Sequence, residues 1–344
     1  MSSRWTRRLL ILAAFAAVAY VVGFGGYGYM VGSPEYLAGT PRDPNCQTPG
    51  SRYGWAYEAV NYDVADDAVL LAANKDPATC ASQGAVAGTV VEAPDGVHLA
   101  AWYIPRTTDP VAANGTAAPT VVIVHGGKSD KSGMLQYAPA FHDTFNLLIV
   151  DLRNSGRSSL ADSTGGLHEQ GDLRAMIDWL EAAKHPIWLA VMGNSNGAST
   201  ALAEAIGDTR VSALILDSMH ASVERQIGNV ISTEKHLPAW PGAWALVAGV
   251  SARLGESVEA VDPIRTIVQL RGRPILLTHG TVDHVDRPAD SLELNVAAAR
   301  AAGVDVEVHT CAGADHGKVV VVCATEWGEW VRAFLLAHGG AELT

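Results

Sequence analysis

The feature that most constrains this fold is a regular alternation of short apolar runs with stretches of helical periodicity. Continuous apolar runs are typical of strands buried on both faces of a sheet, and such strands are parallel. The runs occupy residues 121–124, 147–150, 187–192, 211–216, 275–277 and 304–308. Helical spacing between them predicts helices over residues 173–180, 198–206, 292–302 and 327–336. The alternation predicts an α/β fold with a mostly parallel central sheet flanked by helices.

Two further segments complete the expected domain, which we place at residues 86–340. Residues 86–104 alternate in the manner of strands around Pro94-Asp95-Gly96 and predict a hairpin. Residues 220–261 separate two strands by roughly forty residues, a length that is uncommon for a structureless loop. This segment contains Trp240 and Trp244, and we expect it to form a helical cap over the sheet.

The start of the chain has the pattern of a membrane helix. A basic segment, residues 1–8, with Arg4, Arg7 and Arg8 precedes the uncharged residues 9–31, and a spanning helix needs about 20 mostly apolar residues. We expect a transmembrane anchor with its arginines in the cytoplasm. The alternative is a signal peptide cleaved near Ala19, giving a secreted protein. Both place the remaining chain outside the cytoplasm. Residues 32–85 are expected to be an irregular juxtamembrane segment with one short helix near 64–73.

The charge balance excludes one class of partner. The net charge is −12, and no cluster of Lys and Arg follows residue 8, whereas binding to nucleic acid requires such clusters. We therefore expect no nucleic-acid partner. The sequence also implies no metal and no organic cofactor, and it leaves the oligomeric state open.

The four cysteines, an even number, are consistent with an exported chain that carries disulfides. Four cysteines allow three pairings, and none of them forms a C-x-x-C pair of the kind that binds zinc. We expect neighbours to pair, Cys46 with Cys80 and Cys311 with Cys323. The alternative is that they are buried free thiols.

The strongest chemical signal is Gly193-Asn194-Ser195-Asn196-Gly197, which fits the pattern G-x-S-x-G. It follows a predicted buried strand and precedes an alanine-rich helix, the context in which this pattern forms a nucleophile elbow. The serine then lies on a sharp turn, and the flanking glycines let strand and helix pass closely. Ser195 is the predicted nucleophile. The alternative is an ordinary glycine-rich turn with a capping serine.

A serine nucleophile needs a base, and the base needs an orienting acid. His316 is the histidine that combines a late position, a glycine-flanked loop and a preceding strand. Asp283 follows the strand at 275–277 and gives the order Ser, Asp, His, which is that of α/β-hydrolases. Asp286 on the same loop and Asp217 at the end of the preceding strand remain alternatives for the acid.

Acyl transfer also requires hydrogen-bond donors aimed at the oxyanion. The backbone N–H of Asn196, directly after the nucleophile, is expected to supply one donor. The second is expected from Gly127, in the run His125-Gly126-Gly127-Lys128 after the first parallel strand. The alternative is a glycine-rich turn without this role.

From about residue 87 to residue 338 the chain resembles the α/β-hydrolase superfamily. Further motifs are similar to a bacterial group that is often membrane-anchored and related to prolyl-oligopeptidase-like and acylglycerol-lipase-like enzymes. These motifs are Asp151–Ser158 (D-x-R-x-x-G-x-S), Leu216-Asp217-Ser218, Asp262-Pro263 and His279–Asp283 (HGxxD). The chain departs from that group at Asn196, where many members carry a larger apolar residue, and in the loop after Asp283. The second departure keeps Asp286 among the alternatives.

The resemblance implies a serine hydrolase that cleaves a small-molecule or lipid carboxylic ester through an acyl-enzyme. A serine peptidase or an envelope acyltransferase on the same triad are alternatives, and a non-catalytic binding domain is a fourth. The resemblance also implies that a Cys311–Cys323 bridge would close a short loop containing His316.

Overall fold

The computed structural model describes residues 3–31, 33, 47–60, 90–107 and 118–339. Its centre is a nine-stranded sheet with the order β1-β3-β5-β4-β6-β7-β8-β9, in which β2 pairs with β3. The strands are β1 Glu58–Val60, β2 Val91–Glu92, β3 His98–Ile104, β4 Thr120–Val124, β5 Asn146–Asp151, β6 Leu189–Asn194, β7 Ala213–Asp217, β8 Ile275–Gly280 and β9 Val306–Cys311.

The strands from β4 to β9 all run parallel, as the apolar runs predict. Each predicted run forms a strand within a few residues of its expected position. The expected hairpin is also present, because β2 and β3 pair antiparallel around the turn at Asp95 and Gly96. β3 in turn pairs antiparallel with β5 and joins the hairpin to the parallel sheet.

One strand lies upstream of the expected boundary at residue 86. β1 pairs antiparallel with β3 at the edge of the sheet, and the short helix α3 (Pro49–Tyr53) precedes it. The segment expected to be irregular therefore contributes to the sheet. The helix expected near 64–73 and the cysteines Cys46 and Cys80 lie outside the described residues.

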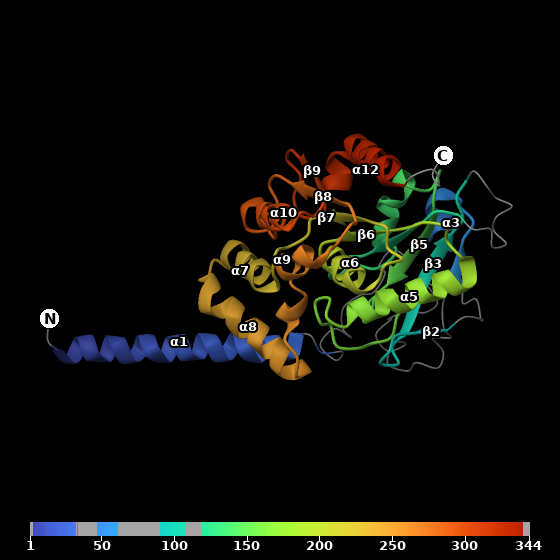
Figure 1. Ribbon diagram of the computed structural model, residues 1–344. Helices are drawn as coiled ribbons and strands as arrows, with labels where there is room; N and C mark the ends of the chain where they lie inside the picture. Colours follow the sequence, from blue (N-terminus) through green and yellow to red (C-terminus); the bar gives the residue numbers. More distant parts are fainter. Residues whose placement is uncertain (1–2, 32, 34–46, 61–89, 108–117, 340–344) are drawn as a thin grey trace.

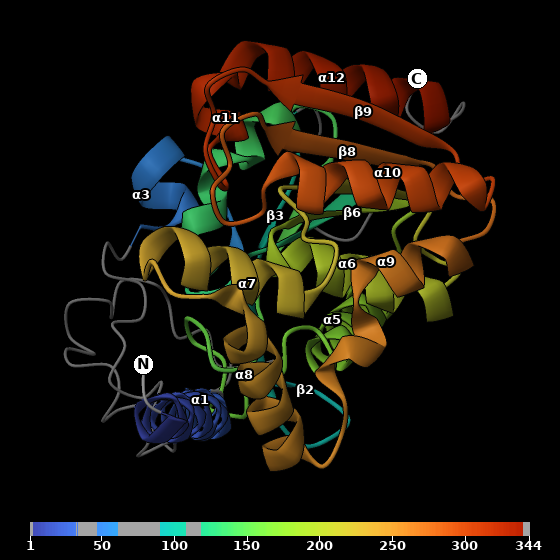
Figure 2. The same ribbon diagram turned by 90° about the vertical axis from the view of Figure 1, so that its left-hand side faces the viewer.

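Helices cover both faces of the sheet (Figures 1 and 2). Successive residues of β4 show why: Val122 and Val124 point to one apolar cluster, and Val121 and Ile123 point to the other. The first cluster is completed by α5 (Glu169–Lys184), α6 (Asn196–Gly207) and α10 (Leu292–Ala301), and the second by α12 (Ala324–His338). This burial on both faces is the reason that the central strands β4 to β7 are apolar at most positions.

The cap segment is helical, as expected. It contains α7 (Val223–Glu234) and α8 (Ala239–Leu254), followed by α9 (Pro263–Thr266). In Figures 1 and 2 the helices α7 and α8 lie between the sheet and α1. Trp240 and Trp244 of α8 are 75% and 51% exposed, so the cap tryptophans face outward. Short helical turns fill the remaining connections, namely η4 Gly133–Gln136, η5 Ala138–Ala140, η6 Val258–Val261, η7 Ile267–Gln269, η8 Pro288–Asp290 and α11 Val319–Val322.

The first helix, α1, spans Ser3–Val31 and extends away from the body of the protein (Figure 1). Its portion Leu10–Val31 is long and apolar enough to cross a membrane, and it is the one such helix in the described part of the chain. The end of α1 nearest the body lies against α8, and Figure 2 shows the two helices side by side.

Candidate active site

Ser195 lies on a strained turn between β6 and α6. Its backbone has φ 52° and ψ −121°, a left-handed conformation that is uncommon for a residue with a side chain. The flanking glycines are required by close backbone approach: a Cβ on Gly193 would lie 2.4 Å from the carbonyl oxygen of Gly197, and a Cβ on Gly197 would lie 2.4 Å from that of His125. The local sequence therefore forms the sharp turn that an elbow needs.

The structure brings Ser195, His316 and Asp283 together at the carboxyl edge of the sheet. The Oγ of Ser195 lies 2.9 Å from Nε2 of His316, and Nδ1 of His316 lies 2.9 Å from Oδ2 of Asp283. With a neutral ring, this arrangement suits Nδ1–H donating to the carboxylate and the serine hydroxyl donating to Nε2. The two contacts join side chains that are 121 and 33 residues apart in the sequence.

Asp283 is held in place by the loop after β8. Its side chain is buried, and Oδ1 accepts hydrogen bonds from the backbone N–H groups of Val285 (3.0 Å) and Asp286 (2.7 Å). His279, near the end of β8, lies beside this carboxylate, with its Nε2 3.5 Å from Oδ2 of Asp283. One carboxylate oxygen is thus occupied by the loop, which leaves the other for His316.

The alternative acid Asp286 lies beside the same imidazole but farther away. Its Oδ2 is 3.6 Å from Nδ1 of His316 and accepts a hydrogen bond of 2.8 Å from Nε2 of Gln226 in α7. Burial raises the pKa of Asp286 to about 7; the charge of His316 and the Gln226 bond oppose this shift, and the charge of Asp283 adds to it. Sequence reasoning missed Gln226, because no local pattern links the cap to this loop.

The carboxylate of the alternative acid Asp217 is hydrogen-bonded to residues other than His316. Its carboxylate accepts hydrogen bonds from Tyr137 Oη (2.8 Å), Thr278 Oγ1 (2.8 Å) and Asn194 Nδ2 (3.0 Å). Its backbone carbonyl also accepts from the N–H of Ser195 at 2.8 Å. Asp217 therefore fixes the position of the serine turn.

The charges around His316 favour its protonated form. Burial alone would lower the pKa of His316, but the hydrogen bond and charge of Asp283, with the charges of Asp286 and Asp217, outweigh burial and raise the pKa above its ordinary value. The neighbouring His220 shows the opposite result: burial, together with the charge of His316, lowers the pKa of His220 to about 4. His316 is thus the better proton acceptor of the two at this edge of the sheet.

The loop after β4 lies against the serine turn. A Cβ on Gly127 would lie 2.9 Å from Nδ2 of Asn196, and a Cβ on Gly126 would lie 3.1 Å from Cβ of Ser195. Asn196 is the first residue of α6, so its backbone N–H has no acceptor inside the helix. The backbone of Gly126 thus lies against Ser195 and that of Gly127 against Asn196, beside the positive N-terminal end of α6.

The loop that carries His316 is closed by a disulfide. Cys311, the last residue of β9, pairs with Cys323 directly before α12, with a Cα–Cα distance of 6.0 Å. This is the predicted pairing of these two cysteines. The bond ties both ends of the His316 loop to the core, where Cys311 is fully buried.

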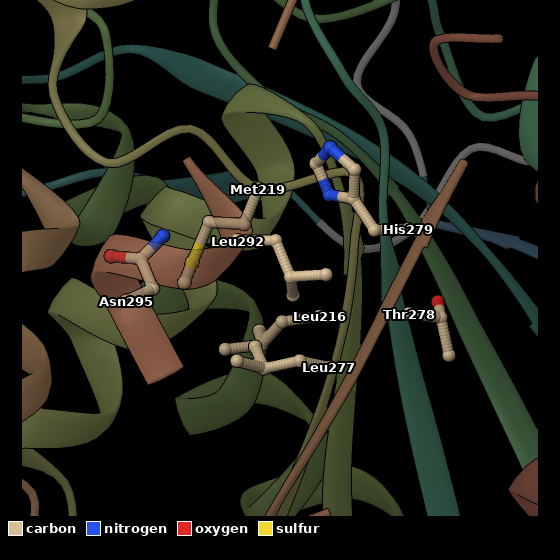
Figure 3. A pocket seen from close by; sticks show the side chains of 7 residues that line it. All are labelled: Leu216, Met219, Leu277, Thr278, His279, Leu292 and Asn295. Atoms are coloured by element: carbon tan, nitrogen blue, oxygen red, sulfur yellow. The ribbon is translucent and has the colours of Figure 1, made fainter. Parts of the chain in front are cut away.

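A small cavity lies behind the site, between β7, β8 and α10 (Figure 3). Figure 3 shows His279 on one side of it and Met219, Leu292 and Asn295 on the other. The cavity has no room for a water molecule, so it is a packing defect below the site. Among the described residues, no group of three His, Cys, Asp or Glu side chains is arranged to hold a metal ion.

Comparison with curated proteins gives partial matches. An uncharacterized protein of Mycobacterium tuberculosis strain H37Rv is 32% identical over 137 residues, which are 39% of this chain and 46% of that protein. The uncharacterized protein YfhR of Escherichia coli strain K12 is 29% identical over 199 residues, 56% of this chain and 61% of YfhR. The chain thus spans about half the length of the first relative and about three-fifths of the second. No family model matches the chain.

Comparison with solved structures covers more of the chain. The Pyrococcus furiosus esterase Pf2001 superposes with a TM-score of 0.64 at 20% identity, over 88% of this chain and 98% of that one. The acylaminoacyl peptidase of Pyrococcus horikoshii gives 0.55 at 16% identity, over 72% of this chain and 41% of that one. The α/β hydrolase GrgF of a Penicillium species gives 0.55 at 16% identity, over 73% and 97%. Together with the strand order and the serine turn, these likenesses show that the chain has the α/β-hydrolase fold.

Proposed function

We propose that this protein is a serine hydrolase that cleaves carboxylic esters through an acyl-enzyme. The observation that carries the proposal is the continuous contact from Ser195 Oγ through the His316 ring to Asp283. The strained φ of Ser195 supports it, because strained backbone conformations cluster at active sites, where the surrounding structure maintains them. The esterase and hydrolase folds that superpose on the chain are consistent with it.

The chemistry follows from the contacts. Ser195 Oγ attacks the ester carbonyl carbon while His316 Nε2 takes its proton, and Asp283 stabilises the imidazolium that forms. The N–H groups of Asn196 and Gly127 donate to the tetrahedral oxyanion. The intermediate then collapses: the C–O bond to the alcohol breaks, and His316 returns the proton to the leaving oxygen. Water repeats the sequence on the acyl-enzyme, with His316 again as base, and releases the acid.

A panel of substrates tests the proposal. We expect the purified full chain to be labelled by a fluorophosphonate and to hydrolyse p-nitrophenyl esters, with little activity on aminoacyl-anilides. Cleavage of the anilides without the esters would replace the proposal by a serine peptidase. Labelling without turnover of either would favour an acyltransferase, and an unlabelled protein would favour a binding domain. The panel includes anilides because the peptidase fold of Pyrococcus horikoshii also superposes on this chain.

We also propose that the protein is anchored in the cell membrane by α1, with the α/β-hydrolase domain on the extracytoplasmic side. Arg4, Arg7 and Arg8 precede the apolar span and favour a cytoplasmic N-terminus. The Cys311–Cys323 disulfide fits an oxidising compartment. The apolar stretch continues well past Ala19, which is the reason that we favour a retained anchor over cleavage at that position.

The disulfide is expected to contribute to both stability and activity. Replacing Cys311 and Cys323 together by alanine should lower the free energy of unfolding by about 3 kcal/mol, because the unfolded chain regains the freedom of the closed loop. Ester turnover should fall as well, since the His316 loop loosens. Chemical denaturation and steady-state kinetics of the double variant measure both. Dithiothreitol should reproduce the effects in the unsubstituted protein. A protein whose mass shows the Cys311–Cys323 bond to be reduced, but whose activity is unchanged, would contradict this role.

A further inference from the structure

The end of α1 nearest the body is in direct contact with the cap helix α8. The hydroxyl of Tyr20 donates a hydrogen bond of 2.5 Å to the backbone carbonyl of Pro238, just before α8 begins. At the other end of the contact, the guanidinium of Arg253 lies 5.6 Å from the centre of the Tyr29 ring. The contact therefore follows α8 along its length, while the rest of α1 extends away from the body (Figure 1).

Between these two ends the backbones of the helices touch through glycines. A Cβ on Gly28 would lie 2.1 Å from the carbonyl oxygen of Leu246, and a Cβ on Gly249 would lie 2.0 Å from that of Gly25. Any side chain at these two positions would separate the helices. Such close approach through small residues is the packing that helices use inside membranes, where apolar burial gives no advantage.

The contact fixes the depth of α8 relative to the candidate span. Leu10–Val31 has 22 residues and is about 33 Å long, which matches a hydrocarbon core of about 30 Å. Tyr20, level with the start of α8, lies well inside that span. If Tyr27 and Tyr29 mark the membrane interface, as tyrosines commonly do, the start of α8 lies about 10 Å below it.

The chemistry of α8 fits this depth. Between Pro238 and Arg253 it carries no charged residue, and Arg253 lies at the end level with Tyr29. Leu237, Trp240 and Trp244 expose 42%, 75% and 51% of their surface; we call these three side chains the cap face. The turn before them carries Glu234 and Lys235, which pair at 3.5 Å. These charges limit insertion to the boundary between headgroups and acyl chains, about 5–10 Å deep.

The cap face is connected to the candidate active site through α7, which packs on α8. Gln226 of α7 binds Asp286 beside the His316 ring, and Glu234 at the end of α7 lies 3.8 Å from Nε2 of His284 on the same loop. The helices that would meet the membrane therefore also border the site.

We infer that the cap face is embedded in the lipid bilayer beside α1, in the leaflet at the C-terminal end of that helix, and that the site takes lipid esters from this leaflet. The first part rests on the α1–α8 contact and on the proposed membrane span of α1. The second part rests on the proposed ester hydrolysis. The bilayer is the occupant that fits this surface, because α8 lies against the candidate span and extends its apolar surface.

The first part is tested by the tryptophans themselves. The full chain is reconstituted in phosphatidylcholine vesicles that contain lipids brominated near the headgroup, and fluorescence quenching is measured. Replacing Trp240 and Trp244 by phenylalanine should remove a large part of the quenched emission. The matched control is Trp179→Phe, since Trp179 packs against Tyr103 on the sheet. If the quenched fraction of the fluorescence is the same in the double variant and in the unsubstituted protein, the cap face does not lie in the bilayer.

The second part is tested by the choice of substrate. We compare hydrolysis of a long-chain fluorogenic ester embedded in the vesicles with hydrolysis of a short soluble ester. Replacing Leu237, Trp240 and Trp244 by glutamine should lower the ratio of the rate on the embedded ester to the rate on the soluble ester by about tenfold or more. The reason is that the cap face would no longer insert into the bilayer. An unchanged ratio would overturn delivery from the bilayer. If the unsubstituted protein hydrolyses neither ester, the proposed ester hydrolysis is refuted instead. The quenching experiment still decides whether the cap face lies in the bilayer.

Discussion

Replacing Ser195 by alanine is expected to lower kcat/KM for the best ester of the panel by about 10⁴- to 10⁶-fold, the largest effect of any single change. The reason is that the triad acts as a unit: without Oγ there is no acyl-enzyme, and His316 and Asp283 have no proton to transfer. Residual activity would come only from binding and from the donors around the oxyanion. Steady-state kinetics measure the loss, and fluorophosphonate labelling should disappear with it.

The matched control is Ser199→Ala, one turn farther along α6. Ser199 is also buried, and its Oγ lies 3.3 Å from the His220 ring rather than from His316. This variant should remain labelled by the fluorophosphonate. If Ser199→Ala lost labelling and Ser195→Ala retained it, the nucleophile would have to be reassigned.

The parts of the fold that the sequence predicted are those encoded by local patterns. The serine turn is the clearest case, because Gly193 and Gly197 stand where a Cβ would collide with backbone. The central parallel strands β4 to β7 were predictable for a related reason: each is buried on both faces, so most of its positions are apolar and not only alternate ones. The Cys311–Cys323 pair, only 12 residues apart, also belongs to this local class.

The parts that could not be predicted depend on contacts between distant residues. Asp217 was an alternative for the acid because it ends a strand, but its partners include Tyr137, 80 residues upstream, which no spacing reveals. β1 is too short for a periodic pattern, and its place in the sheet comes from pairing with β3. The packing of α1 on α8 joins Tyr20 to Pro238, a separation of 218 residues. In each case the sequence shows a residue type but not its neighbour.

The assignment of the acid is the remaining point that kinetics can decide. Asp283→Asn is expected to lower kcat by about 10⁴-fold, because an amide at this position can donate to Nδ1 and stabilise the wrong tautomer of His316. Asp286→Asn should cost far less, within about tenfold at alkaline pH, since the 2.9 Å contact of Asp283 with His316 remains. The comparison is well matched, because the two aspartates lie on one loop, are both buried and differ by 2.9 against 3.6 Å in distance to Nδ1.

The Asp286 variant should also change the pH profile in a defined direction. His316 must be neutral to act as base, so kcat/KM rises with pH as the imidazolium loses its proton. The pKa of His316 is raised in part by the charge of Asp286, and the pKa of Asp286 is itself raised to about 7, so the two groups titrate as a coupled pair. Removing that charge should lower the pKa of His316 and move the acidic limb to lower pH. A limb that moves to higher pH would contradict this coupling, and a loss in Asp286→Asn as large as that expected for Asp283→Asn would make Asp286 the orienting acid.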